Sequence, residues 1–183
     1  MSPLRPRPFY VLLVAASLVS CTDAKDAVSP NQRKAASDKP SLTLGSGSAS
    51  SPLGRATFTD PNDPTFEIKR ITDKWHVDVK AKPGLDVAVQ SITFNPGSQS
   101  GWHRHPGPAF IEVVQGTMTF YESDDPTCSP IVRTAGQGYL DMGDHAHIAR
   151  NETSLPAKNV VVYLVPPGAA LRIDAPRPGN CPF

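Results

Sequence analysis

The stretch Gly97–Gly116, GSQSGWHRHPGPAFIEVVQG, decides how the rest of this chain is interpreted. It contains His103 and His105, and the whole chain has 5 histidines. Residues i and i+2 of a strand point to the same face, so these two imidazoles are expected to face one spot. Because neutral imidazole is the commonest metal ligand among side chains, the pattern indicates a metal site. Barrel-lining histidines without a ligand are the alternative.

A second pair, His145 and His147, follows Gly136 and Gly143. A strand carrying this pair beside the first would bring a third imidazole to the same spot. The two pairs account for all but one of the 5 histidines, which favours a metal site over unliganded histidines.

These spacings resemble the cupin superfamily. The first cupin motif places a glycine, a His-x-His pair, a glutamate and a second glycine at fixed intervals. Four residues fall in register with it: Gly97, His103, His105 and Gly116. The second motif is matched by three residues: Gly136, His147 and Asn151. The resemblance covers roughly half of the chain that would remain after removal of a signal peptide.

The chain departs from the motifs at three positions. Ala109 stands where the first motif has its glutamate. Glu112 is near in sequence but has the opposite strand parity, so its side chain is expected to face away from the metal. Met142 and Asp144 replace the proline and the glycine of the second motif.

The resemblance therefore implies one divalent transition metal held by three histidines: His103, His105 and His147. His145 is a possible fourth ligand in the altered turn. Asp141 and Asp144 rank below it, because aspartates in turns mostly bond to their own backbone. Imidazole suits iron, manganese, zinc, copper and nickel, so the sequence does not select the metal.

The domain around these motifs reads as short extended runs punctuated by proline and glycine. The chain has 20 prolines, and no stretch shows a sustained helical period, which argues against long helices. Strands are expected at 65–70, 75–79, 86–94, 101–105, 109–114, 117–121, 131–134, 138–140, 147–151, 159–165 and 171–174. Together with the resemblance, this pattern predicts an all-β fold, a cupin-type jelly-roll barrel or double-stranded β-helix.

Three local expectations follow from the same pattern. Gly116 lies between two extended runs and is expected to form a tight hairpin. The run 160–165, VVVYLV, is expected to be a central strand. Arg172 and Asp174 share one strand face and are expected to form a surface ion pair of little energetic consequence.

The N-terminal residues 1–20 are interpreted as a lipoprotein signal peptide. Their apolar run, 9–19, is shorter than the ~20 residues that span a bilayer. The run ends in Leu18-Val19-Ser20-Cys21, which resembles the bacterial lipobox. The resemblance implies that Cys21 carries a lipid anchor, so the protein would be exported to the cell envelope and attached to a membrane. An ordinary signal peptide with an incidental cysteine is the alternative.

Residues 21–52 are rich in small and polar residues and are expected to be a flexible tether. Residues 53–183 are expected to be one cupin β-barrel domain. The chain carries 18 Lys and Arg against 17 Asp and Glu, a balance that gives no footprint for nucleic acid. The oligomeric state is left open, and a dimer is one option.

The 3 cysteines fit the same organisation. With Cys21 assigned to a lipid, Cys128 and Cys181 remain, and in an oxidising envelope compartment they are expected to form a disulfide. Free thiols or a metal role are the alternative.

Two functions of different class remain open. The first is a small-molecule metalloenzyme, a dioxygenase-like oxidoreductase, in which the substrate takes the open metal positions and His145 is the side chain that could act as base. The second is a non-catalytic module that captures a metal or a small ligand. The catalytic residues are not identified, and no acid or base stands out beside the expected ligands.

Overall fold

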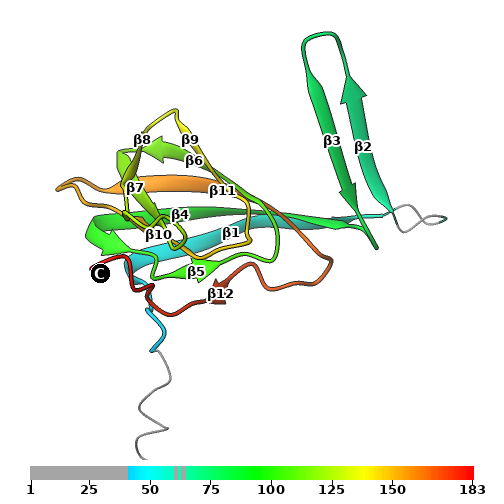
Figure 1. Ribbon diagram of the computed structural model, residues 1–183. Coiled ribbons are helices and arrows are strands. Elements are labelled where there is room, and N and C mark those ends of the chain that lie inside the picture. Colours follow the sequence, from blue (N-terminus) through cyan, green and yellow to red (C-terminus); the bar gives the residue numbers. More distant parts are fainter. Residues whose placement is uncertain (1–40, 60–61, 63–64) are drawn as a thin grey trace, which may run out of the picture. The chain divides into compact units, whose positions relative to one another are not determined.

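The computed structural model describes residues 41–59, 62 and 65–183 (Figure 1). The expected signal peptide, Cys21 and most of the expected tether lie outside these residues. The described residues form strands and no helix, which confirms the all-β prediction. Accordingly, this part of the chain holds no helix with the length and apolarity needed to cross a membrane.

The barrel has two layers of antiparallel strands. The first layer has the order β1-β4-β11-β6-β9, with β1 Ser46–Phe58, β4 Leu85–Gln99, β11 Ala157–Val165, β6 Ala109–Gln115 and β9 Gly138–Asp141. The second has the order β12-β5-β10-β7-β8, with β12 Ile173–Asp174, β5 His103–Arg104, β10 His147–Arg150, β7 Thr117–Glu122 and β8 Ile131–Thr134. One pairing, Arg150 with Gln99, joins the layers between β10 and β4. This arrangement is a jelly roll.

A separate two-stranded sheet interrupts the chain between β1 and β4. It consists of β2 Phe66–Ile71 and β3 His76–Ala81. Most of its side chains are exposed, and two ion pairs cross it: Lys69 with Asp78 and Lys80 with Glu67.

The principal core lies between the two layers. In β11 the buried and half-buried positions alternate along the whole strand, as expected for a strand with one face on the core. β11 is also central, because it pairs with β4 on one side and β6 on the other, as the sequence predicts. The largest fully buried apolar side chains of this core include Phe94, Val113, Met118, Phe120 and Val161. Burying each of these stabilises the fold by roughly 1.5–3 kcal/mol.

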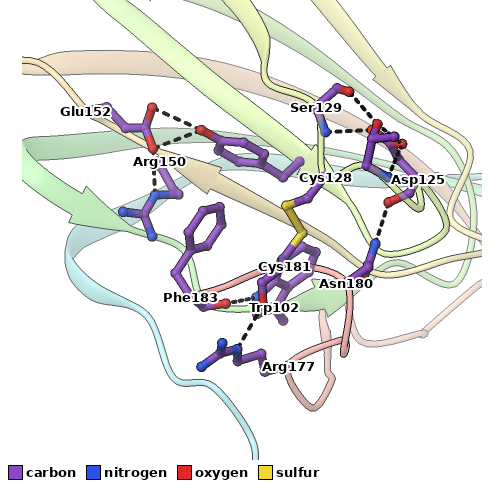
Figure 2. The surroundings of a disulfide bond; sticks show 12 residues. Trp102, Asp125, Cys128, Ser129, Arg150, Glu152, Arg177, Asn180, Cys181 and Phe183 are labelled. Atoms are coloured by element: carbon purple, nitrogen blue, oxygen red, sulfur yellow. Dashed lines mark hydrogen bonds and ion pairs between the residues drawn. A yellow bond between two sulfur atoms is a disulfide. The ribbon is translucent and has the colours of Figure 1, made fainter.

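A second core covers the outer face of β5, β7 and β10 (Figure 2). Trp102, which is fully buried, donates from Nε1 to the Phe183 carbonyl at 3.0 Å. Phe183 packs on the Tyr121 ring and under the Arg150 guanidinium. A disulfide between Cys128 and Cys181 holds the C-terminal segment against this face, and it is the pairing expected from the cysteine count.

The sequence analysis places residues 46–52 in the tether, but the structure places them in β1. This strand pairs with β4 at eleven positions, from Ser46 opposite Gln99 to Phe58 opposite Leu85. Nearly all its side chains are exposed, so β1 has no alternating apolar pattern that sequence analysis could detect. Its backbone bonds to β4, together with contacts to Asp86, hold it in place.

The prediction of a tight hairpin at Gly116 is wrong. β6 pairs with β11 and β9, whereas β7 pairs with β10 and β8, so the strands on either side of Gly116 do not pair with each other. Gly116 instead carries the chain from one layer to the other. Its φ of 73° and the Pro156 carbonyl, 2.7 Å from where a Cβ would lie, explain why glycine is needed there.

Candidate metal centre

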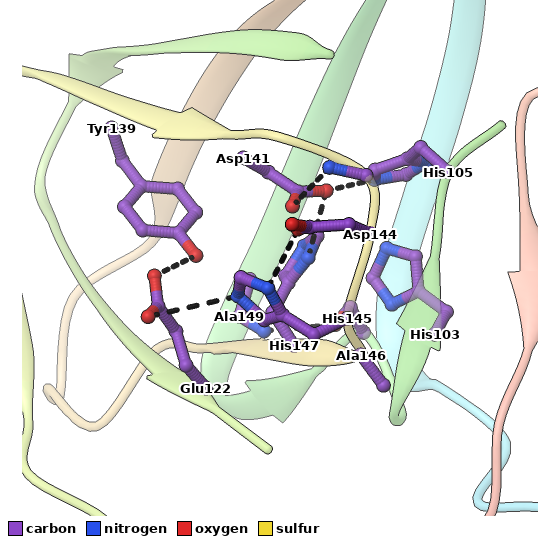
Figure 3. Close-up of polar contacts among 12 residues, drawn as sticks. His103, His105, Glu122, Tyr139, Asp141, Asp144, His145, Ala146, His147 and Ala149 are labelled. Atoms are coloured by element: carbon purple, nitrogen blue, oxygen red, sulfur yellow. Dashed lines mark hydrogen bonds and ion pairs between the residues drawn. The ribbon is translucent and has the colours of Figure 1, made fainter. Parts of the chain in front are cut away.

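Three histidines converge inside the barrel (Figure 3). His103 in β5 lies directly opposite His147 in β10, and His105 follows two residues after His103. Their ring centroids are 4.5–5.2 Å apart, and one nitrogen from each lies within 4.8 Å of the others. The structure therefore brings together the three residues that the sequence assigns as ligands.

Backbone carbonyl groups orient two of the three rings by bonding to Nδ1. Nδ1 of His103 lies 2.8 Å from the Gly101 carbonyl, and Nδ1 of His105 lies 2.5 Å from the Leu171 carbonyl. A carbonyl can only accept, so Nδ1 carries the proton in both rings and Nε2 keeps its lone pair. This is the tautomer that a metal at the centre requires.

Burial keeps at least two of these rings neutral. Burial, and next the charge of His147, hold the pKa of His103 well below its usual value. The same two causes lower the pKa of His105 to about 4. Neutral imidazole is the form that binds metal, so no proton has to be removed from these rings at neutral pH.

Asp141 is the residue that the sequence analysis ranked too low. It pairs with Ala109 across β9 and β6, and both residues are almost completely buried. Its Oδ1 accepts the Gly143 amide at 2.9 Å, which is the local backbone bond expected of a turn aspartate. Its Oδ2, however, lies 3.1 Å from Nδ1 of His147 and 3.6 Å from Nε2 of His105.

A carboxylate is therefore present next to the histidines, although the position of the motif glutamate is Ala109. Burial alone would raise the pKa of Asp141, but the contact with His147 and the Gly143 amide outweigh it and lower the pKa. Asp141 is thus ionised at neutral pH and adds one negative charge beside the three rings.

His145 is not brought to this centre. It groups with Glu122 and Asp124, whose carboxylate oxygens lie 3.6 and 3.5 Å from its Nε2. Asp144 pairs with its Nδ1 at 2.8 Å. Glu112 is exposed in β6, as its strand parity predicts. The described residues therefore supply three histidines and no other imidazole to the centre.

A cavity of 440 Å³ opens onto the centre. It is lined by His103, His105 and ten further residues: Ser48, Ser50, Gln90, Ile92, Phe94, Ser100, Tyr163, Ala170, Leu171 and Arg172. Its size is in the range of small-molecule sites. The sequence analysis does not predict three of these lining residues. It assigns Ser48 and Ser50 to the tether, and it expects Arg172 in a surface ion pair.

The donor set fits a divalent transition metal. The three buried rings converge, and Oδ2 of Asp141 and Nδ1 of His147 lie 3.1 Å apart without a hydrogen bond of good geometry among the described residues. Because buried polar atoms seldom lack a partner, the closeness of this carboxylate to Nδ1 suits a ring that presents Nε2 to an ion.

A jelly-roll barrel with histidines directed inward from β5 and β10 is a cupin-type barrel. In agreement, residues 90–163 match the model of the Cupin_2 family, described as "Cupin domain". This region includes both motifs identified in the sequence. No curated protein sequence matches the chain.

Several solved structures are similar to the chain. A conserved protein with a double-stranded β-helix domain from Klebsiella pneumoniae is 21% identical, with a TM-score of 0.43, over 50% of this chain and 76% of that one. The Cupin_2 domain of an XRE family transcriptional regulator from Enterobacter cloacae is 18% identical, with a TM-score of 0.41, over 67% and 99%. A polyketide cyclase from Streptomyces resistomycificus is 11% identical, with a TM-score of 0.46, over 72% and 75%. At TM-scores below 0.5, these likenesses support no functional conclusion.

Proposed function

We propose that His103, His105 and His147 bind one divalent transition metal through Nε2, and that the domain is a metalloenzyme acting on a small molecule. The observation that carries this proposal is the position of the cavity, which is lined by His103 and His105 and so leads to the metal position. The reaction class that we propose is a dioxygenase-like oxidation. Three neutral protein ligands and an open side suit such chemistry better than a closed structural site.

A divalent ion held by neutral nitrogens keeps its double charge and polarises donor atoms bound at its open positions. The chain contributes the orientation of the rings. The Gly101 and Leu171 carbonyls hold two rings by Nδ1, and Asp141 faces the Nδ1 of the third. Ala109 has no ligand atom at the position of the motif glutamate, so the protein ligands that we propose are the three histidines alone.

A non-catalytic binding module is the second candidate, and one observation favours it. Apart from the histidines, the only cavity-lining groups that titrate are Tyr163 and Arg172. Burial is the main cause that raises the pKa of Tyr163 to about 12, so it cannot act as a base near neutral pH. His145, the candidate base from the sequence, is not among the lining residues.

The metal is tested by measuring metal content in His103→Ala and His147→Ala. Each variant is expected to fall well below one ion per chain, because each loses one of three ligands. His76→Ala, which changes an exposed histidine at the start of β3, is the control and should keep the wild-type content. Full occupancy after both His103 and His147 are changed would contradict the proposal.

The reaction is tested separately, with oxygen uptake and product formation by the iron-loaded protein on small thiols, diols and dicarbonyls. Turnover that is lost in His147→Ala supports the oxidoreductase. A protein that holds its metal but turns over no compound, with any of the five candidate metals, supports the binding module instead.

We also propose that Cys21 carries a lipid that anchors the domain to a membrane of the cell envelope. The short apolar run and the lipobox-like residues before Cys21 support this. Cys21→Ser should yield soluble protein or unprocessed precursor after cell fractionation. Membrane-bound protein with its signal removed would place the anchor elsewhere.

A further inference from the structure

We infer that the cavity selects small carboxylate anions with an apolar body, and that Arg172 is the residue that determines this specificity. The inference deepens the proposed function and rests on it, because the metal is taken as the second point that attracts the anion. It concerns the same cavity and names the class of molecule that enters it.

The permanent charge among the residues that line the cavity is positive. None of its twelve lining residues is an aspartate or a glutamate, and Arg172 is its one residue with a permanent charge. A divalent ion at the histidines would outweigh the single negative charge of Asp141 beside them. The ion and Arg172 would then both attract an anion, while Asp174 offsets part of the Arg172 charge.

Arg172 is arranged to bind a carboxylate. Its Nε donates to Oδ1 of Asp174 at 2.6 Å. Neither terminal nitrogen has a hydrogen bond to the described residues, so both remain free to donate. Paired N–H donors of this kind match the two oxygens of a carboxylate.

Arg172 is one of the residues that line the cavity, and its side chain is 36% exposed. A ligand in the cavity can therefore reach its guanidinium.

The remaining walls set the body of the ligand. The lining includes three apolar side chains, Ile92, Phe94 and Leu171, and three polar ones, Ser48, Ser50 and Gln90. Ser48 and Ser50 of β1 lie opposite Phe94 and Ile92 of β4, so polar and apolar groups are neighbours on one wall. A ligand with one charged end and a compact apolar or aromatic body can contact the three apolar side chains, whereas a polyol would bring hydroxyl groups against them.

The test is isothermal titration of the zinc-loaded protein with benzoate, phenylacetate and 3-phenylpropionate. Each acid is compared with its own primary amide, which has nearly the same shape and no charge. Zinc is chosen because it has no redox chemistry, so binding is measured without turnover. At least one carboxylate is expected to bind about tenfold more tightly than its amide.

Arg172→Gln should remove most of this difference, lowering carboxylate affinity by up to about tenfold and leaving amide affinity unchanged, while the metal keeps the remainder. Arg172→Lys keeps the charge without the paired donors and should retain part of the preference. Arg70→Gln, on the separate hairpin, is the matched control and should behave as wild type. Equal affinity for acid and amide in the wild type, an unchanged preference in Arg172→Gln, or no carboxylate binding at all would overturn the inference.

Metal content is measured on every sample, so that the two proposals can fail separately. If the purified protein cannot be loaded with metal but carboxylates still bind through Arg172, the metalloenzyme proposal fails and the specificity stands. If one ion is held per chain but Arg172→Gln changes nothing, the specificity fails and the metal centre stands.

Discussion

Asp141 shows how a single pairing between strands alters the chemistry of the centre. Its position opposite Ala109 places a carboxylate behind His147, where Oδ2 and Nδ1 are 3.1 Å apart. Histidine ligands usually donate their second N–H to such an acceptor, which orients the ring and increases its basicity. In the metal centre that we propose, Asp141 therefore acts through His147.

Asp141→Asn should weaken metal binding about 10–100-fold, because the amide keeps the shape but loses the charge that supports His147. Competition with a chelator measures the affinity, and thermal unfolding of the metal-free protein shows whether the fold is intact. Asp144→Asn is the matched control, since Asp144 is exposed and contacts His145. Equal affinity in Asp141→Asn and wild type would contradict this role.

The three histidines were predictable because their placement depends on local rules. His103 and His105 share a face by the two-residue period of a strand, and His147 belongs to a motif of fixed spacing. Asp141 and Arg172 were not predictable, because their roles depend on long-range placement. Asp141 is positioned by the pairing of β9 with β6, and Arg172 follows Leu171, whose carbonyl bonds to His105.

At the scale of elements, β1 supplies two residues that line the cavity, Ser48 and Ser50, and it is a strand that the sequence analysis did not predict. Its residues are polar and exposed, so its stability comes from contacts with its neighbour rather than from a buried face of its own. Asp86, buried in β4, accepts from Thr57 Oγ1 at 2.5 Å and from Arg55 Nε at 2.6 Å. It also accepts the Gly168 amide at 2.9 Å. One carboxylate thus ties β1 to the barrel.

Asp86→Asn should lower the melting temperature by several degrees at pH 7. The hydrogen bonds from Thr57 and Gly168, and then Arg55, hold the pKa of Asp86 below its usual value of 3.8. A carboxylate with a lower pKa in the folded state stabilises the fold above its unfolded pKa, and this stabilisation is lost as the pH falls through the folded value.

The difference between wild type and Asp86→Asn should therefore be largest near pH 7 and shrink as the pH falls below 3.8. Urea titrations at several pH values measure it. Asp78→Asn, which changes an exposed carboxylate of the hairpin, is the control. A difference that is constant with pH would show that the charge of Asp86 does not hold β1.

Some of the other strands were predictable because apolar residues alternate in them and proline or glycine separates them. β6 and β11 have this alternation, and their observed bounds differ from the expected ones by one or two residues. The pairing of the strands could not be predicted from the same sequence pattern. The chain leaves Gly116 for the opposite layer, and only the packing of the whole barrel determines that direction.

At the scale of the whole molecule, the C-terminal segment connects the outer face of the barrel to the centre. Trp102 and His103 are adjacent in sequence, and their side chains lie on opposite faces of the second layer. Trp102 is covered by the segment that ends at Phe183, to which it donates its indole hydrogen. The segment also donates from Asn180 to the Asp125 carbonyl and from Arg177 to the Cys181 carbonyl. The position of His103 is thus supported from behind by residues far away in sequence.

The disulfide should therefore stabilise both the fold and the metal centre. It closes a loop of 53 residues, for which the chain-entropy model gives about 4 kcal/mol. Replacing Cys128 and Cys181 by serine should lower the free energy of unfolding by up to about that amount, measured by urea titration. Metal affinity should also fall, because Trp102 and β5 lose their cover, and chelator competition measures this loss.

Reductant provides the matched control for this prediction. It should lower the unfolding midpoint of the wild type towards that of the double-serine variant and leave the variant itself unchanged. Non-reducing peptide mapping of the wild type should recover the peptides of Cys128 and Cys181 joined. Two freely alkylated thiols, or a wild type that is insensitive to reductant, would contradict it. Lost stability with unchanged metal affinity would show that the segment stabilises the barrel without positioning His103.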